Sequence, residues 1–152
     1  EADLEKDRLP LPDGTADAIT CMHLVEHLRE PGRLFEEVRR LLAPAGRVYF
    51  ETPHPRSLTA SRRVPMRGEM ITTNFYDDPG HVRLVTPLQL ASLCRSHGLV
   101  PEKCGVSRNW LIAAAYGWYR WRKPSRSRQI AYTHFLGWSS YLVARAADRK
   151  QH

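Results

Sequence analysis

The sequence has few cysteines, no long apolar run and no low-complexity tract. Its three cysteines, Cys21, Cys94 and Cys104, are widely spaced and form no Cys-x-x-Cys pair, which argues against a disulfide framework and a zinc knuckle. No apolar run reaches the length of a membrane span, and the charged residues 1–7 are unlike a signal peptide. A chain of 152 residues can bury one sizeable core, so we expect a single cytoplasmic domain.

Acidic residues are scarce in the C-terminal third of the chain. Residues 1–107 contain 14 Lys and Arg against 15 Asp and Glu, whereas residues 108–152 contain 9 against 1, which is Asp148. All four tryptophans lie in that same basic stretch. A basic segment rich in aromatic residues indicates an anionic partner, either a lipid surface or a nucleic acid.

Short apolar runs alternate with amphipathic segments, a pattern that predicts an α/β fold. Residues 16–22 and 47–52 are rich in β-branched and aromatic residues and predict strands, and residues 31–42 between them have apolar side chains at helical spacing. Strand, helix and strand in succession form a right-handed crossover unit of a parallel sheet. Further along, we expect loops over 56–85 and 123–128, helices over 86–97 and 110–121, and strands over 99–106 and 139–146.

Histidines follow the first two predicted strands. His23, Glu26 and His27 come after the first strand at i, i+3 and i+4, so two imidazoles and a carboxylate share one face of a helical turn. His54 follows the second strand, and His81 lies in the long segment after it. Because ligands of open α/β sheets bind beyond the carboxyl ends of the strands, these residues form the candidate site.

Two segments of the chain resemble class I S-adenosylmethionine-dependent methyltransferases. The first is ADLEKDRLPLPDGTADAITCMHLVEHLREPGRLFEEVRRLLAPAGRVYFETPHP, which contains a Thr-Cys-Met-x-x-x-Glu-His string and is similar to small-molecule members such as the ubiquinone-biosynthesis O-methyltransferases. The second, DDPGHVRLVTPLQLASLCRSHGLVPEKC, resembles the continuation of the same family. Together the two segments carry the resemblance from residue 1 to about residue 106.

The resemblance implies a Rossmann-like sheet with strand order 3-2-1-4-5-7-6, of which residues 1–152 would hold strands four to seven and their flanking helices. It also implies S-adenosyl-L-methionine as the cofactor, with adenine contacts at Asp3 and Leu4 and further cofactor contacts at Met22 and His23. The nine glycines contain no G-x-G-x-x-G loop to cradle the cofactor. We therefore expect an N-terminally truncated methyltransferase domain that by itself binds the cofactor poorly and is inactive.

The histidines allow more than one chemical role. Methyl transfer to an acceptor often needs a base, and His54 and His81 are the candidate catalytic residues; alternatively, both only form hydrogen bonds within their loops. The resemblance also implies a Mg²⁺ site with Glu26, His27 and His81 as candidate ligands. However, His23 replaces the first Glu of the family's Glu-x-x-Glu-His string, and imidazole suits magnesium less well than carboxylate. Without a metal, the Glu-His pair would orient the cofactor loop through hydrogen bonds.

Residues 108–138 are predicted to form a basic aromatic insertion or lid before the last strand. Trp118 and Trp121 either pack in the core or lid, or belong to an interfacial helix that associates with a membrane and suits a lipid-linked acceptor. The sequence thus predicts an O-directed methyltransferase acting on a small-molecule or lipid-linked acceptor. Two alternatives are a degenerate methyltransferase-like binding module and an RNA-modifying methyltransferase, of which the latter would bind RNA with a steep salt dependence.

Overall fold

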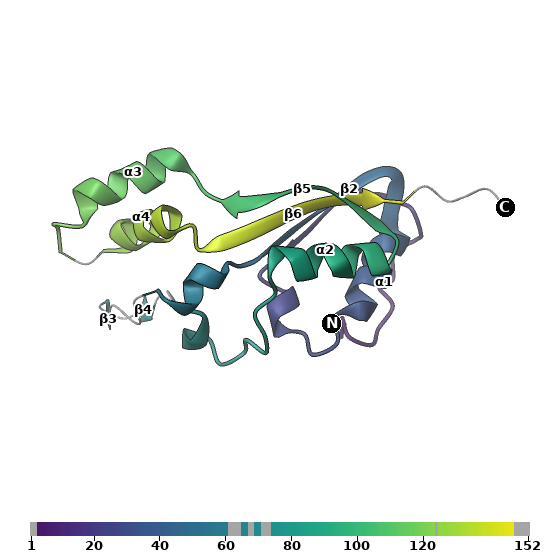
Figure 1. Ribbon diagram of the computed structural model, residues 1–152. Helices are drawn as coiled ribbons and strands as arrows, with labels where there is room; N and C mark the ends of the chain where they lie inside the picture. Colours follow the sequence, from purple (N-terminus) through teal and green to yellow (C-terminus); the bar gives the residue numbers. More distant parts are fainter. Residues whose placement is uncertain (1–2, 61–64, 67–68, 71–73, 124, 148–152) are drawn as a thin grey trace.

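The computed structural model describes residues 3–60, 65–66, 69–70, 74–123 and 125–147. Four strands form one sheet in the order β1-β2-β6-β5, and their bounds are Ala16–Met22 for β1, Leu42–Pro53 for β2, Leu99–Ser107 for β5 and Ser139–Ala146 for β6 (Figure 1). β1 and β2 are parallel, and β6 runs antiparallel to both β2 and β5. This is the order 4-5-7-6 that the family resemblance implies, and it confirms the predicted α/β fold and its parallel crossover.

Two amphipathic helices, α1 (Gly32–Leu41) and α2 (Pro87–Ser96), cover one face of the sheet (Figure 1). At the start of α2 the Thr86 side chain accepts a hydrogen bond from the backbone N–H of Gln89, whose own side chain accepts from the backbone N–H of Thr86. The apolar positions of α1 recur at helical spacing, and they bury Leu34, Phe35, Val38 and Leu41. Both helices confirm the predictions made from that spacing.

Alternation along the strands separates a buried face from a partly open one. Val48 and Phe50 of β2 point into the core, where the Phe50 ring stacks on Phe35 of α1 with centroids 4.9 Å apart. On the opposite face Tyr49 stacks on Tyr141 at 5.8 Å, and both rings are half-buried. The core therefore lies between the sheet and the α1–α2 layer, as the period-two pattern of a half-covered sheet requires.

β2 is longer than the predicted strand 47–52, because it begins at Leu42, directly after α1. Its pairing with β1 shifts register between Ala16 and Ala18, so β2 carries extra residues at that point. Gly46 lies in this irregular stretch, where a β-carbon would be 2.6 Å from the carbonyl oxygen of Ala16. Only glycine allows the two backbones to approach so closely.

The segment 56–85, predicted as one long loop, contains several short elements. They are η2 (Pro55–Leu58), β3 (Pro65–Met66), β4 (Glu69–Met70) and η3 (Phe75–Asp77), with β3 and β4 paired antiparallel. The arginines of this segment at positions 62, 63 and 67 lie outside the described residues. The predicted helical turn after β1 is confirmed as η1 (Val25–His27).

A helical hairpin of α3 (Trp110–Tyr119) and α4 (Arg126–Leu136) projects from the end of the sheet (Figure 1). The predicted loop over 123–128 is wrong in its second half, because the Ser125 side chain accepts from the N–H of Arg128 and begins α4. The alternative that the hairpin tryptophans pack in the core is also wrong, because Trp118 is 65% exposed and Trp121 is 78% exposed. Within the described parts of the chain, no helix is long and apolar enough to cross a membrane.

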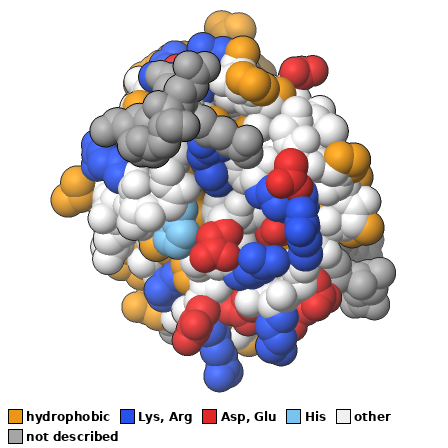
Figure 2. All heavy atoms as spheres, turned by 90° about the vertical axis from the view of Figure 1, so that its right-hand side faces the viewer, with side chains coloured by type: hydrophobic (Ala, Val, Ile, Leu, Met, Phe, Trp, Pro, Cys, Tyr) orange, Lys and Arg blue, Asp and Glu red, His pale blue; other side chains and the backbone are white. Residues whose placement is uncertain are grey.

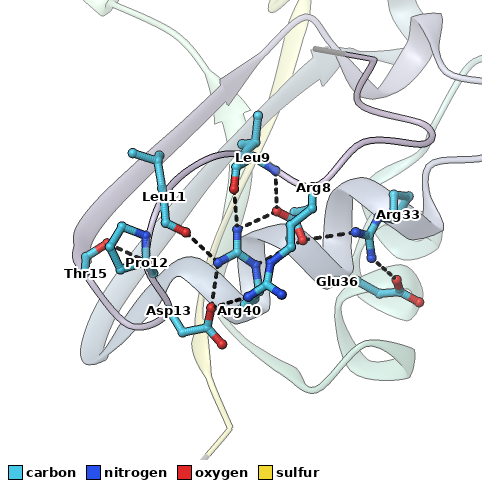
Figure 3. A network of polar contacts seen from close by, with 10 residues as sticks. Arg8, Leu9, Leu11, Pro12, Asp13, Thr15, Arg33, Glu36 and Arg40 are labelled. Carbon is cyan, nitrogen blue, oxygen red and sulfur yellow. Dashed lines mark hydrogen bonds and ion pairs between the residues drawn. The ribbon is translucent and has the colours of Figure 1, made fainter.

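The opposite end of the molecule mixes charges of both signs, which Figure 2 shows as interleaved red and blue side chains. Its main ion-pair network centres on Arg40 of α1 (Figure 3). Arg40 Nη1 lies 2.7 Å from Asp13 Oδ1, and Arg40 Nη2 lies 2.7 Å from Oε2 of the buried Glu37. Arg40 also donates to the carbonyl oxygens of Leu9 and Leu11, so it fastens the segment before β1 to α1.

Candidate active site

The ends of all four strands meet at one edge of the sheet. Met22 at the end of β1 pairs with Glu51 of β2, and Pro53 at the end of β2 pairs with Ser139, the first residue of β6. Ser107, the last residue of β5, pairs with the same Ser139. Residues that follow β1, β2 and β5 are therefore neighbours in space, at the edge where open α/β sheets bind their ligands.

His23 forms the turn between β1 and η1 and contacts two carboxylates. Its φ of 49° is a left-handed conformation that few residues other than glycine adopt, and it redirects the chain sharply after the strand. Nδ1 of His23 lies 3.1 Å from Oε1 of Glu26, and Nε2 lies 3.6 Å from Oε1 of Glu51. The backbone N–H of His23 also donates to the Glu51 carbonyl oxygen at 2.9 Å.

The charges of this group follow from burial and hydrogen bonding. Burial alone would lower the pKa of His23, but the hydrogen bonds with Glu26 and Glu51 outweigh burial and raise it to about 9. Burial alone would raise the pKa of Glu51, but the hydrogen bonds from His23, Tyr49 and Ser139 lower it to about 2. At neutral pH an imidazolium therefore lies between carboxylates, and His23 serves to hold Glu26 rather than to accept a proton.

A second group of ligand atoms lies on the other side of Glu26. Nδ1 of His27 is 3.0 Å from the carbonyl oxygen of Gly80, and Nδ1 of His81 is 2.7 Å from that of Phe75. Because a carbonyl oxygen only accepts, both Nδ1 atoms carry the proton, and both Nε2 atoms present a lone pair. One ligand atom from each of Glu26, His27 and His81 lies within 4.8 Å of the other two.

This arrangement fits a divalent cation. Glu26 is fully buried, and its Oε2 has no hydrogen-bond partner among the described residues. Histidines that donate one N–H to a carbonyl while the other nitrogen is open are the usual form of metal-ligating histidine. Two imidazoles and a carboxylate favour Mn²⁺, Co²⁺ or Zn²⁺ more than Mg²⁺. Asp78 adds a carboxylate oxygen 3.8 Å from Nε2 of His81.

The structure thus brings together three of the residues predicted as metal ligands, Glu26, His27 and His81. His23 is next to them and contacts Oε1 of Glu26. The two candidate catalytic histidines lie in different groups, because His81 belongs to this cluster whereas His54 caps η2. Nδ1 of His54 accepts from the backbone N–H of Arg56 at 3.1 Å.

The residues expected to contact the cofactor are accessible. Met22 is 57% exposed at the end of the edge strand β1, so its apolar side chain is open to solvent. Asp3 and Leu4 lie in an N-terminal turn, and the hydrogen bond from Lys6 lowers the pKa of the Asp3 carboxyl. An ionised carboxylate of this kind accepts hydrogen bonds, as a contact with the amino group of adenine requires.

The sequence-based reasoning missed several residues of the site: Tyr49, Glu51, Asp78 and Ser139. Glu51 had a detectable signal, because an acidic residue near the end of an apolar strand is costly to bury without a partner. Asp78 stands three residues before His81, a spacing that would have indicated a contact. Nothing in the sequence marked Tyr49 or Ser139, since their roles depend on pairing between β2 and β6.

Known proteins share both sequence and fold with this chain. A family model described as "Methyltransferase domain" matches residues 2–103. A ubiquinone biosynthesis O-methyltransferase of Paraburkholderia xenovorans is 32% identical over 89 residues, which cover 57% of this chain and 37% of that protein. The corresponding enzyme of Aromatoleum aromaticum is 30% identical over 101 residues, which cover 63% of this chain and 42% of that enzyme. The chain thus spans about two fifths of the length of these curated relatives.

Solved structures show the same fold. A chain from the complex between the Haloferax volcanii Trm112 methyltransferase activator and a methyltransferase superposes with a TM-score of 0.63 at 16% identity, covering 97% of this chain and 60% of that one. An S-adenosylmethionine dependent methyltransferase from Mesorhizobium loti superposes with a TM-score of 0.60 at 20% identity, and the match covers 95% of this chain and 67% of that one. At these identities the likeness concerns the fold alone.

Proposed function

This chain belongs to the methyltransferase domain family, and from that premise we propose that the protein is an S-adenosylmethionine-dependent methyltransferase directed at oxygen. The acceptor in this proposal is a small or lipid-linked molecule, as the name of the ubiquinone-biosynthesis relatives suggests. One observation carries the proposal beyond the family: the group of Glu26, His27 and His81 at the ligand-binding edge of the sheet.

The proposed chemistry divides between the cofactor, a cation and the side chains. The cofactor supplies the sulfonium methyl group, and a divalent cation on Glu26, His27 and His81 would bind the acceptor hydroxyl and lower its pKa. Glu26 contributes the only carboxylate of the trio, and the His23 imidazolium fixes its orientation through Oε1. The carbonyl oxygens of Gly80 and Phe75 fix both imidazole rings and their tautomers.

The proposal is tested on the complete protein with a chelator. We expect chelation to abolish methyl transfer and Mn²⁺ or another divalent cation to restore it. Glu26→Gln keeps the shape of the side chain but removes its charge, so it should lose the cation and the activity. Glu36→Gln is the matched control, because Glu36 is an exposed residue of α1 that pairs with Arg33. Full activity in chelator, with Glu26→Gln and His81→Ala still turning over, would exclude the metal.

We also propose that the α3–α4 hairpin contacts a membrane. Trp110, Trp118 and Trp121 are 72%, 65% and 78% exposed, and the neighbouring Leu111 is 84% exposed. Exposed apolar surface of this extent is unusual and marks an interaction site. The Arg122 guanidinium lies over the Trp118 ring, 4.4 Å from its centroid. The Arg120 guanidinium lies over the Trp121 ring at the same distance.

Charge complementarity favours an anionic lipid surface as the partner. Residues 110–136 contain five Lys and Arg and no Asp or Glu, so the hairpin offers cations beside its exposed rings. Interfacial helices combine these two features, with tryptophan at the level of the headgroups and basic residues next to anionic lipids. Such a contact would bring a lipid-linked acceptor close to the active edge of the sheet.

A further inference from the structure

Two arginine side chains lie beside Gly137. A β-carbon on Gly137 would lie 2.5 Å from Nη2 of Arg108 and 3.2 Å from Nη1 of Arg56. Two guanidinium groups therefore approach the same small residue, which joins α4 to β6. Glycine leaves the space that both groups use, and its φ of 67° matches its role as the end of α4.

Neither arginine is neutralised in the part of the chain that the structure describes. The ion pairs there involve other residues, so no carboxylate lies within 4 Å of Arg56 or Arg108. Among the described residues, the guanidinium group of Arg56 donates only to the carbonyl oxygen of Leu136, at 3.4 Å. Arg108 packs over the Trp110 ring, and its Nε is buried without a hydrogen-bond partner. Like charges held this close are unfavourable unless an anion lies between them.

His54 lies next to Arg56 and can supply a further donor. Its Nδ1 accepts from the N–H of Arg56 at 3.1 Å, so a neutral ring carries its proton on Nε2. Burial lowers the pKa of His54, and the charges of Arg56 and Arg108 lower it further. A ring in this state donates a hydrogen bond from Nε2. This differs from the general base expected from the sequence.

The three residues lie at the active edge of the sheet. His54 and Arg56 follow β2, and Arg108 follows β5. Gly137, which both guanidinium groups approach, comes just before β6. The backbone N–H of His54 donates to the carbonyl oxygen of Trp138 at 2.6 Å, which fixes the β2 end against the start of β6. The ring of the same Trp138 lies 5.3 Å from the ring of His23, so the donor group is close to the Glu26 site.

We propose that His54, Arg56 and Arg108 form a binding site for an oxyanion, a carboxylate or phosphate group carried by the methyl acceptor. The assignment of the anion to the acceptor rests on the proposed function, whereas the anion site itself does not. The planar fork of arginine donates paired N–H groups to two oxygens of a carboxylate or a phosphate, and the Nε2–H of His54 can add a further donor. Such a site would fix the acceptor at a distance from its reacting hydroxyl.

The test uses the complete protein with two probes, inorganic phosphate and benzoate, and follows binding by calorimetry and by the NMR signals of the His54 ring. We expect at least one probe to bind saturably and to shift those signals. Arg108→Gln and Arg56→Gln should each weaken that binding by about tenfold, the effect of losing one charged hydrogen bond. The tighter probe identifies the acceptor as a carboxylate or as a phosphate ester.

Arg47→Gln is the matched control, because it removes the same charge within β2, away from the carboxyl end of the strand, where Arg47 pairs with Glu102. It should leave the affinity unchanged within about twofold, since screened long-range charge contributes little. Arg108→Lys, which keeps the charge but loses the planar fork, should fall between wild type and Arg108→Gln. Equal losses in all three Gln variants, or no saturable binding of either probe, would overturn the anion site. Loss of methyl transfer with intact anion binding would instead count only against the proposed function.

Discussion

Nδ1 of His23 lies 3.1 Å from Oε1 of Glu26, a carboxylate that also supplies a ligand atom within 4.8 Å of ligand atoms from His27 and His81. His23 thereby acts as a positioning residue for the buried carboxylate. We expect His23→Gln to weaken binding of Mn²⁺ by about 10- to 100-fold, the usual effect of removing a partner that orients a metal ligand. Glu26→Gln should abolish the binding.

Calorimetry or the electron paramagnetic resonance of free Mn²⁺ measures this difference without relying on activity. Glu36→Gln serves again as the control and should bind like wild type. If His23→Gln bound Mn²⁺ as tightly as the unaltered protein, the positioning role of His23 would be wrong. A metal site could still exist in that case, because its three ligands would be unchanged.

The Arg40 network predicts an acid-sensitive part of the stability. The hydrogen bond from Arg40 is the largest cause that lowers the pKa of both Glu37 and Asp13. A carboxyl whose pKa falls on folding stabilises the native state at pH values above its ordinary pKa. That contribution to the stability is lost as the pH falls through the lowered pKa of the folded state. Arg40→Gln should therefore lower the urea midpoint at pH 7, and the gap to wild type should narrow below about pH 4.

Urea unfolding of both proteins at several pH values checks this prediction. Arg47→Gln is the control, since its ion pair with Glu102 is more exposed and should contribute little. If the urea midpoints of Arg40→Gln and wild type differed by the same amount from pH 7 to about pH 2.5, Arg40 would act only through its hydrogen bonds to carbonyl oxygens.

Two glycine substitutions should have opposite effects on stability. A β-carbon on Gly46 would meet the carbonyl oxygens of Ala16 at 2.6 Å and Ala43 at 3.1 Å, both of them backbone atoms that cannot move aside cheaply. Gly46→Ala should therefore destabilise the protein by about 1–3 kcal/mol. Gly117 lies within α3 with open space around it, so Gly117→Ala should stabilise by about 0.5–1 kcal/mol. Denaturant unfolding measures both, and an equal sign for the two changes would contradict the packing described for β1 and β2.

The exposed hairpin rings predict a loss of membrane binding without a loss of stability. The double variant Trp118→Ala and Trp121→Ala should bind anionic vesicles more weakly, while its thermal midpoint changes little, because exposed side chains contribute little to folding. Leu88→Ala is the control: Leu88 is 77% exposed on α2, and its loss should leave vesicle binding unchanged. Vesicle sedimentation at two salt concentrations measures the effect. Unchanged vesicle binding with a lower thermal midpoint, or tight RNA binding with a steep salt slope, would refute the membrane contact.

The framework of this protein follows from local patterns in its sequence. The apolar spacing of residues 31–42 and the Thr86-Pro87 start of the next helix specify α1 and α2, because helical period and N-caps are local properties. The strands over 16–22, 99–106 and 139–146 follow equally from local composition. The i, i+3, i+4 spacing after β1 also placed the chemistry-bearing residues at the right strand end.

How those residues share their contacts depends on tertiary packing. Glu26 contacts His23 through Oε1 and is also grouped with His27 and His81, and spacing alone cannot distinguish these contacts. α4 was missed because its residues 126–136 show no regular apolar period, and its stability comes from packing against α3. The meeting of Arg56 with Arg108 depends on three strand ends converging from distant parts of the chain. Contacts between residues far apart in sequence are set by sheet pairing, which no local pattern encodes.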